Sequence, residues 1–296
     1  MKPIQTCPIC GSEKIEIKHQ SLDFLVTQSF FSIMECDNCG TCTTSPQPDT
    51  LEIDAYYKSE DYISHSGKST GIIESLYKIA RFFTLRSKRT LIENESMLRK
   101  GKLLDIGCGS GEFLRFCQDS GWDVTGIEPG VSAREKASEL LGKKVHKTDA
   151  LFQNLDEKFD VISMWHVLEH VHDPNKYISH IRDLLNPKGV IIIAVPNYTS
   201  TDANDYGAEW AAWDAPRHLF HYSPKSMRYL VSKAGMKLDR LKMMPFDPFY
   251  VSLLTEKSVK SNGSIIKACW VGFKSWFISL FAKENASSLI YIIRKS

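Results

Sequence analysis

The chain has 296 residues, of which 43% are hydrophobic and 24% charged, enough for one large core plus a small accessory module. Its 37 basic residues nearly balance its 35 acidic residues, which argues against a protein that grips nucleic acid through a strongly basic surface. Met1 leads into a cysteine motif without the apolar segment typical of a secretory signal, so we expect a cytoplasmic protein.

Two CxxC motifs, each followed by glycine, open the chain and predict a structural zinc site. The four thiols are those of Cys7, Cys10, Cys36 and Cys39. Paired knuckles of this kind present four sulfurs to one tetrahedral ion, whereas a redox site needs a single CxxC. Residues 14–18 between them alternate polar and apolar side chains, as in a strand. We therefore predict a zinc ribbon over residues 1–48, with Cys42 outside the ligand set.

A helical linker or lid is expected over residues 49–100. From Thr70 to Lys100 the pattern is helical and basic, with Lys88 and Arg89 among its cations. A solvated helix face is the ordinary explanation for such charge, and a phosphate-bearing substrate is the alternative.

An apolar strand at 102–106 runs into three alternating glycines and then into a helix. Gly107, Gly109 and Gly111 follow Asp105 and read GxGxG, whereas the dinucleotide fingerprint reads GxGxxG. Glycines permit positive φ and let a ligand approach the backbone. The sequence Asp-x-Gly-x-Gly-x-Gly resembles motif I of class I S-adenosylmethionine (SAM) methyltransferases.

This resemblance implies SAM as cofactor, S-adenosylhomocysteine as product, and a set of cofactor contacts. Glu128 ends the next strand, where its carboxylate would accept from both ribose hydroxyls. Asp149 would accept from the adenine amine, and Trp165 follows a further strand. The full predicted cofactor set is Asp105, Gly107, Gly109, Gly111, Glu128, Asp149 and Trp165.

Strand and helix patterns alternate through the remainder of the chain. Residues 159–164 and 189–196 are apolar without alternation, which suits strands covered on both faces. We expect an α/β fold in which residues 101–296 form a doubly wound, mostly parallel, seven-stranded Rossmann-like sheet, with a helical insertion at about 250–285.

Two histidine-rich segments are candidates for chemistry. In methyltransferases the loop after the fourth strand lines the junction of cofactor and substrate, and here it holds His166, Glu169 and His170. His166 or His170 would serve as a general base. The letters HxxEH also match an inverted zinc-protease motif, but that motif belongs on a helix rather than directly behind a buried strand. The run resembles the ExxEH of methyltransferases that bind a divalent ion, with histidine at the first position; whether an ion binds here stays open.

The second segment, residues 209–224, contains two tryptophans, an arginine and the candidate catalytic residues His218 and His221. Its Pro-Arg-His-Leu-Phe-His run is similar to segments of zinc-ribbon methyltransferases that act on sugars and other small molecules. Bracing of a lid is the structural alternative for both histidines. Ser223 and Pro224 predict a helix start.

The tail is expected to supply a strand at 236–244, a helix at 265–281 and an edge hairpin at 288–294. The helix carries Lys267 and Lys274 on one face and aromatic residues elsewhere. Burial as a helical cap is the first interpretation, and a peripheral membrane contact serving a lipid-linked substrate is the second.

The sequence thus predicts SAM-dependent O- or C-methylation of a small molecule such as a sugar nucleotide, a lipid-linked glycan or a quinone-like phenol. An RNA methyltransferase that uses the ribbon to hold RNA is one alternative, although the Asn/Asp-Pro-Pro-Tyr signature is absent. A SAM-binding protein without turnover is the other. The acceptor and the oligomeric state are not predicted.

Overall fold

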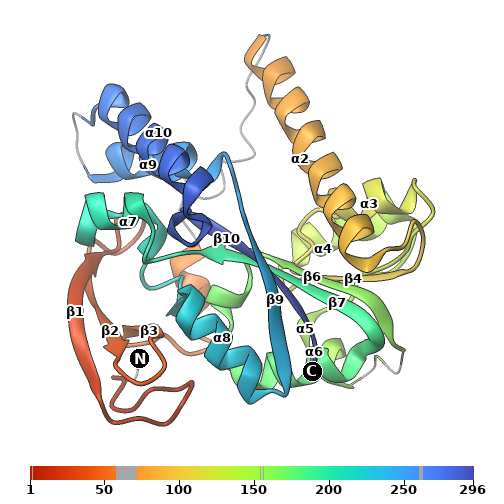
Figure 1. Cartoon of the computed structure of the whole chain (residues 1–296), viewed down its shortest axis with the longest axis horizontal. Coiled ribbons are helices and arrows are strands. Elements are labelled where there is room, and N and C mark those ends of the chain that lie inside the picture. Colours follow the sequence, from red (N-terminus) through yellow and green to blue (C-terminus); the bar gives the residue numbers. More distant parts are fainter. Residues whose placement is uncertain (2, 58–71, 154, 156, 260–262) are drawn as a thin grey trace.

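The computed structural model describes residues 1, 3–57, 72–153, 155, 157–259 and 263–296. Two β-sheets organise this part of the chain, a larger central sheet and a smaller N-terminal one (Figure 1). Residues 58–71 of the expected linker lie outside the described residues. The linker segments that are described are helical, with a 3₁₀ turn η1 at Ile53–Tyr57 followed by the long helix α2.

The central sheet has six strands in the order β5-β4-β6-β7-β10-β9. Its first four strands pair in parallel, and β10 runs antiparallel to both of its neighbours. The strands are β4 (Lys102–Ile106), β5 (Asp123–Ile127), β6 (Phe159–Trp165), β7 (Leu185–Pro196), β9 (Met236–Met243) and β10 (Ser288–Lys295). The Rossmann-like α/β class is confirmed, but the predicted count of seven strands is wrong for the described residues.

A seventh strand would need residues 144–150, the segment that contains Asp149, to pair beside β5. This pairing is reduced to a single bridge between Ile127 and His146, and the helix α5 begins immediately afterwards at Thr148. The segment between Gly142 and Thr148 is too short and too polar to continue the pairing.

Helices cover both faces of the central sheet. One face packs against α2, α3 and α4, and the other against α5, α6 and α8. Neighbouring residues of β7 divide between the two cores, with Val190 and Ile192 in one and Ile191 and Ile193 in the other. The helices are α2 (Ile72–Ser96), α3 (Glu112–Gln118), α4 (Val131–Leu141), α5 (Thr148–Gln153), α6 (Pro174–Leu184), α7 (Thr201–Tyr206), α8 (Pro224–Lys233), α9 (Asp247–Val259) and α10 (Ile265–Phe281). Short 3₁₀ turns are η3 (Leu168–His170), η4 (Gly207–Glu209), η5 (Ala211–Trp213) and η6 (Lys283–Asn285).

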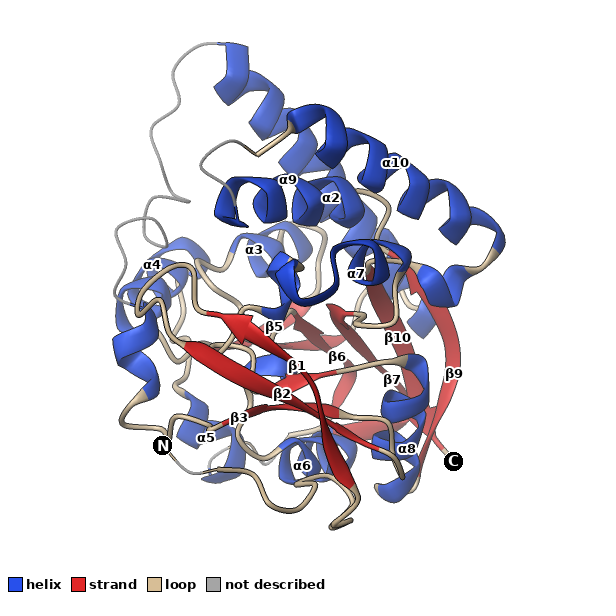
Figure 2. Ribbon diagram, turned by 90° about the vertical axis from the view of Figure 1, so that its left-hand side faces the viewer, coloured by secondary structure: helices blue, strands red, loops and turns tan. Residues whose placement is uncertain are grey.

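The smaller sheet joins the N-terminal module to the rest of the molecule. It has the order β1-β2-β3-β8, in which β1 (Ile15–Leu22), β2 (Phe30–Cys36) and β3 (Cys42–Ser45) are joined by β8 (Phe220–His221). Figure 2 shows this sheet in front of the central one. The fourth strand, β8, comes from the segment that follows β7 in the chain, so the small sheet is completed by a distant part of the sequence.

The C-terminal part departs from its prediction in one respect. Strand β10 is interior, between β7 and β9, so β9 rather than the last strand forms the sheet edge. Helices α9 and α10 follow β9 and precede β10 in the chain. They pack against each other and lie at the outer edge of the molecule (Figures 1 and 2). Within the described ranges, no helix combines the length and the apolarity that crossing a bilayer requires.

Candidate active site

The glycine turn after β4 has the backbone that its sequence predicts. Gly107, Gly109 and Gly111 have φ values of 73°, 55° and 81°, in the left-handed region that favours glycine. A β-carbon at Gly107 would overlap the Val167 side chain, and one at Gly111 would lie 2.9 Å from the Ala137 β-carbon. A β-carbon at Gly109 would meet no atom within 4 Å, so this glycine faces open space. The outer glycines therefore serve packing, and the middle one leaves room for a ligand.

Glu128, at the carboxyl end of β5, is bonded directly to this turn. Its Oε2 accepts from the Gly109 N–H at 2.8 Å, and its Oε1 accepts from the Gly130 N–H at 2.8 Å. These two bonds fix the carboxylate beside the glycine that faces open space. The structure thus brings Glu128 and the glycine turn together, as the sequence predicts.

Asp105 lies on β4 beneath the same turn and is 2% exposed. The Ser163 hydroxyl of β6 donates to its Oδ1 at 2.6 Å. Burial raises the pKa of Asp105 to about 7, against the opposing effects of that hydrogen bond and of the Lys88 ammonium. Perturbed carboxyl groups beside an open turn are typical of ligand sites.

Trp165 ends β6 and packs edge-on against Phe113 of α3, with ring centroids 5.8 Å apart. The Lys88 ammonium of α2 lies 4.3 Å from the Trp165 ring. Burial lowers the pKa of Lys88 despite the charges of Asp105 and Asp247, which raise it. Sequence analysis placed Lys88 on a basic helix without a specific role, whereas its ammonium contacts the Trp165 ring of this site.

Asp149 is set apart from the other predicted cofactor residues. It lies in the first turn of α5 with its side chain 62% exposed, 2.9 Å from the Lys147 ammonium. Its contact with an adenine amine stays a prediction.

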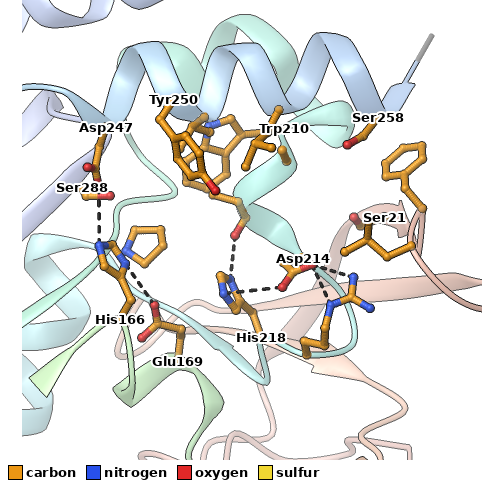
Figure 3. Close-up of a pocket in the computed structure, with 18 of the residues that line it drawn as sticks. Ser21, His166, Glu169, Trp210, Asp214, His218, Asp247, Tyr250, Ser258 and Ser288 are labelled. Atoms are coloured by element: carbon orange, nitrogen blue, oxygen red, sulfur yellow. Dashed lines mark hydrogen bonds and ion pairs between the residues drawn. The ribbon is translucent and has the colours of Figure 1, made fainter. Parts of the chain in front are cut away.

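A cavity of about 670 Å³ opens beyond the carboxyl ends of β6 and β7. Its walls come from the N-terminal module (Ser21 and Phe24), from the turns after β6 and β7, and from α9. Figure 3 shows His166, Glu169 and His218 along one side of the cavity, with Tyr250 and Ser258 of α9 on another. Cavities at this edge of an open parallel sheet are the usual place for ligands.

His166 stands at the base of the cavity between two carboxylates. Its Nδ1 lies 3.4 Å from Glu169 Oε1, and its Nε2 lies 3.5 Å from Asp247 Oδ2. Burial lowers the pKa of His166, but the contact with Glu169 and the charge of Asp247 outweigh it and hold the pKa above its ordinary value. The backbone of His166 has a φ of 55°, which is uncommon for a residue with a side chain and is typical of functional positions.

A second cluster, of Glu169, His170 and His218, lies beside His166. One ligand atom from each side chain falls within 4.8 Å of the others. Glu169 is 1% exposed, and neither of its carboxylate oxygens has a hydrogen bond within the described part of the chain. Burial alone would raise the pKa of Glu169, but His166 and then His170 hold it below its ordinary value.

Both histidines of this cluster are oriented by backbone carbonyls. His170 Nδ1 lies 3.0 Å from the Arg217 oxygen, and His218 Nδ1 lies 2.9 Å from the Ala212 oxygen. A carbonyl oxygen accepts a hydrogen bond from an N–H group, so Nδ1 carries the proton in each ring and Nε2 bears the lone pair. The Tyr57 hydroxyl also lies 3.0 Å from His170 Nδ1, and Asp214 Oδ2 lies 3.9 Å from His218 Nε2. Burial and the neighbouring His170 lower the pKa of His218 to about 4, which keeps its ring neutral.

His221 does not join the other candidate histidines. It is 4% exposed within β8, its Nε2 lies 3.0 Å from the Thr44 hydroxyl, and it does not line the cavity. Burial lowers its pKa well below the ordinary value. This environment matches the bracing alternative rather than a role as a base.

The Methyltransferase domain family matches residues 78–241, which is more than half of the chain and includes the glycine turn, Glu128 and His166. The chain belongs to this methyltransferase family. The prediction of a class I SAM-dependent methyltransferase is thereby confirmed.

Curated relatives of this methyltransferase include ubiquinone biosynthesis O-methyltransferases. That of Azorhizobium caulinodans is 29% identical over 160 residues, which cover 50% of this chain and 63% of the relative. That of Actinobacillus pleuropneumoniae is 31% identical over 178 residues, covering 54% and 74% of the two chains. The chain thus spans less than two thirds of the Azorhizobium protein.

Solved structures support the fold. The magnesium protoporphyrin IX methyltransferase of Synechocystis with bound S-adenosylhomocysteine superposes with a TM-score of 0.53 at 14% identity. The superposition covers 84% of this methyltransferase and 100% of the other protein.

The four predicted cysteines of the methyltransferase converge at its N-terminal end. The Cys7 and Cys39 sulfurs lie 3.5 Å apart, as do those of Cys10 and Cys36, and all four sulfurs lie within 4.8 Å of one another. Such spacing fits a tetrahedral zinc ion with bonds of about 2.3 Å. Cys42 lies in β3 outside this group.

Buried ion pairs attach the N-terminal module to the cavity. Arg217 donates to Asp23 Oδ1 at 3.0 Å and to Asp214 Oδ1 at 2.6 Å, and both Asp23 and Arg217 are almost fully buried. Asp23 follows β1, whereas Arg217 and Asp214 flank the cavity. Sequence analysis found neither this network nor the contribution of Ser21 and Phe24, since no local pattern relates residues so far apart.

Proposed function

We propose that this methyltransferase transfers the methyl group of SAM to a hydroxyl of a small molecule that carries a flat ring. The observation that carries the proposal is the 670 Å³ cavity whose base holds His166 at the end of β6. The adjacent strand ends hold the glycine turn and Glu128. The names of the curated relatives support oxygen as the acceptor atom.

On the cofactor side, residues of the chain would bind SAM and orient its methyl group. Glu128 would accept from the ribose hydroxyls while keeping its bond to Gly109, and open space at Gly109 admits the ligand. Asp105, buried beneath the turn, would contribute negative charge near the cationic parts of SAM, and the Trp165 ring would supply an apolar surface. Alignment of oxygen, methyl carbon and sulfur is most of the catalysis, because the sulfonium already activates the methyl group.

On the acceptor side, the chain handles one proton. The acceptor oxygen forms a bond to the methyl carbon as the carbon–sulfur bond breaks, and its electrons return to sulfur to leave neutral S-adenosylhomocysteine. The hydroxyl proton passes to His166 Nε2, whose contact with Asp247 stabilises the imidazolium. Trp210 and Tyr250 enclose the cavity, and their rings suit a flat acceptor.

The cluster of Glu169, His170 and His218 fits a divalent cation. The buried Glu169 carboxylate and the two histidine rings are a carboxylate–imidazole donor set, although His218 Nε2 also lies 3.9 Å from Asp214 Oδ2. A bound ion would polarise an acceptor hydroxyl as a Lewis acid. Binding is tested without turnover by electron paramagnetic resonance of Mn²⁺, whose signal should change with native protein and not with Glu169→Gln.

The cysteine cluster is proposed to hold structural zinc. Its four thiolates leave no open coordination position for chemistry. Its role is to hold the module whose Ser21 and Phe24 line the cavity.

The function is tested with methyl-labelled SAM and three acceptor classes: ortho-dihydroxyphenols, sugar nucleotides and transfer RNA. Calorimetry should first give SAM binding on the order of micromolar. We expect label on the phenols, and a loss of about 10²–10⁴ in kcat for His166→Gln with SAM affinity retained. Label on RNA with steep salt dependence would contradict the proposal. Tight SAM binding without transfer to any class would indicate a protein that binds SAM without turnover.

A further inference from the structure

We propose that α10 lies flat on a lipid bilayer and that the acceptor cavity takes its substrate from that membrane. The first part stands on the surface of α10 alone. The second part rests on the proposed function, because it concerns the acceptor.

Helix α10 is oriented opposite to an ordinary surface helix. The residues that it buries are small: Ala268, Val271, Gly272, Ser275 and Ser279. Apart from Lys267 and Cys269, the residues that it exposes are large and apolar: Ile265, Ile266, Trp270, Phe273, Phe277, Leu280 and Phe281. Trp270 is 67% exposed and Phe281 80% exposed. The sequence-based expectation of a buried cap is therefore wrong for these aromatic side chains.

Specific contacts fix this orientation. A β-carbon at Gly272 would lie 2.9 Å from the Phe249 ring, so the two helices approach closely through a glycine. The Ser275 hydroxyl donates to Asp202 Oδ1 at 2.7 Å, and Lys274 lies 2.8 Å from Asp205. Rotating the helix to bury its aromatic face would break all three contacts. The exposed face is thus a built feature, and contiguous exposed apolar surface of this kind marks an interaction site.

The chemistry of the face favours a bilayer as its partner. Residues 265–281 include no acidic residue, and the two lysines are paired with Glu256 and Asp205. The face therefore presents tryptophan, phenylalanine and aliphatic side chains with little net charge. This composition suits the boundary between head groups and acyl chains. At 17 residues the helix is also shorter than the ~20 residues that a span needs, so it would lie in the membrane plane.

The face continues toward the acceptor cavity through α9. In this helix, Val251 and Leu254 line the cavity, whereas Leu253 is 43% exposed; Phe246, directly before the helix, is 74% exposed. Figure 3 shows Tyr250 and Ser258 of the same helix at the cavity wall. An acceptor with an apolar chain would keep the chain in the membrane while its ring enters past α9. Membrane contact and acceptor binding would then both use this helix.

Flotation of the purified full chain with phosphatidylcholine vesicles tests the first part. We expect the native protein to float with the vesicles at low and at high salt, since the contact is apolar rather than ionic. Replacing Trp270, Phe273 and Phe277 together by serine should weaken binding on the order of tenfold or more. The matched control replaces Phe30, Leu51 and Met97 by serine. These residues are at least as exposed on average as the three of α10 and lie outside α9 and α10, so flotation should stay unchanged.

Quenching by brominated lipids gives a second, site-specific reading. Native protein should lose tryptophan emission on these vesicles, and Trp270→Phe should lose much less while still floating. Failure of the native protein to float would overturn the inference. Unchanged flotation of the triple variant would also overturn it. So would a native dimer in sedimentation that is a monomer in the triple variant, because the face would then bind a second copy of the chain.

Acceptor kinetics test the second part, that the cavity takes its substrate from the membrane. The triple variant should raise KM on the order of tenfold for a long-chain dihydroxyphenol in vesicles and leave KM for a short-chain soluble analogue unchanged. Equal KM changes for both acceptors would overturn the membrane route. If neither acceptor is methylated, the proposed function fails, while flotation still decides whether α10 docks on a bilayer.

Discussion

The two ligand regions of this methyltransferase are held together by different means. The cofactor region is built mainly from backbone on adjacent strands, with Glu128 bonded to the N–H groups of Gly109 and Gly130. The acceptor region is built from side chains of distant segments, joined by the Asp23–Arg217–Asp214 ion pairs. The first is part of the central core, and the second depends on how the N-terminal module is seated.

This difference implies that the two regions can fail separately. Damage to the module should remove acceptor binding and spare SAM binding, whereas damage at the strand ends should remove SAM binding and spare the module. Lys88 would couple the two regions, because the charges of both Asp105 and Asp247 raise its pKa against the effect of burial.

The largest expected effect is that of metal loss. Structural zinc contributes about 10–16 kcal/mol in small zinc domains, so Cys10→Ser or a strong chelator should unfold the module. Metal analysis should find one zinc per native chain and none in the variant. Methyl transfer should be abolished while calorimetry gives a SAM Kd within about threefold of native. An equal loss of SAM affinity would mean that the two regions are not separable.

The next effect is on the buried ion pairs. Arg217→Met leaves Asp23 and Asp214 without their cation and should destabilise the protein by about 3–5 kcal/mol in urea unfolding. The same substitution at Arg228, whose pair with Glu284 is half exposed, should cost at most about 1 kcal/mol. Similar losses at both positions would contradict the importance assigned to the buried network.

A smaller effect is expected at the cofactor region. Glu128→Ala removes two charge-assisted hydrogen bonds to the turn and the proposed ribose contacts, about 3 kcal/mol together, or a hundredfold in SAM affinity by calorimetry. Glu135→Ala, at an exposed position on α4, is the matched control and should leave affinity unchanged. Native zinc content in both variants would show that the module is intact.

The smallest effect is a pH dependence from Asp105. Because its pKa is raised to about 7 in the protein without ligand, the carboxyl is protonated below that pH and ionised above it. A cationic ligand favours the ionised form, so SAM affinity should rise with pH up to about 7, by at most tenfold per unit, and then level off. Stability without SAM should change in the opposite sense, falling as pH rises from about 4 to 7. Asp105→Asn should make both SAM affinity and stability independent of pH over this range. If either still depends on pH in the variant, another group is responsible.

Local features of the sequence predicted much of the cofactor region. Alternate glycines and the acid that ends the next strand act over short distances, and the structure has the expected turn. The helix start at Ser223 is confirmed as well, because capping by a side chain and proline at the first position are local.

Features that depend on distant contacts were missed. The segment near His146 pairs with β5 through a single bridge, at Ile127, and so forms no strand. Strand β8 pairs with β3, although more than 170 residues separate them in the sequence. The orientation of α10 also eluded sequence reasoning. Hydrophobicity predicts that aromatic residues face inward, whereas Gly272 and Ser275 give a closer fit to α9 and Asp202.

The pairing of Thr43 with Phe220 has a consequence for biosynthesis. The cysteine knuckles leave the ribosome first, yet the strand that completes their sheet is made roughly 10 to 40 s later at ordinary elongation rates. During that interval the β3 edge is unpaired and open to other nascent chains. Early capture of zinc would keep this half-built sheet in register until its last strand arrives, so yield in the cell should depend on zinc supply during translation.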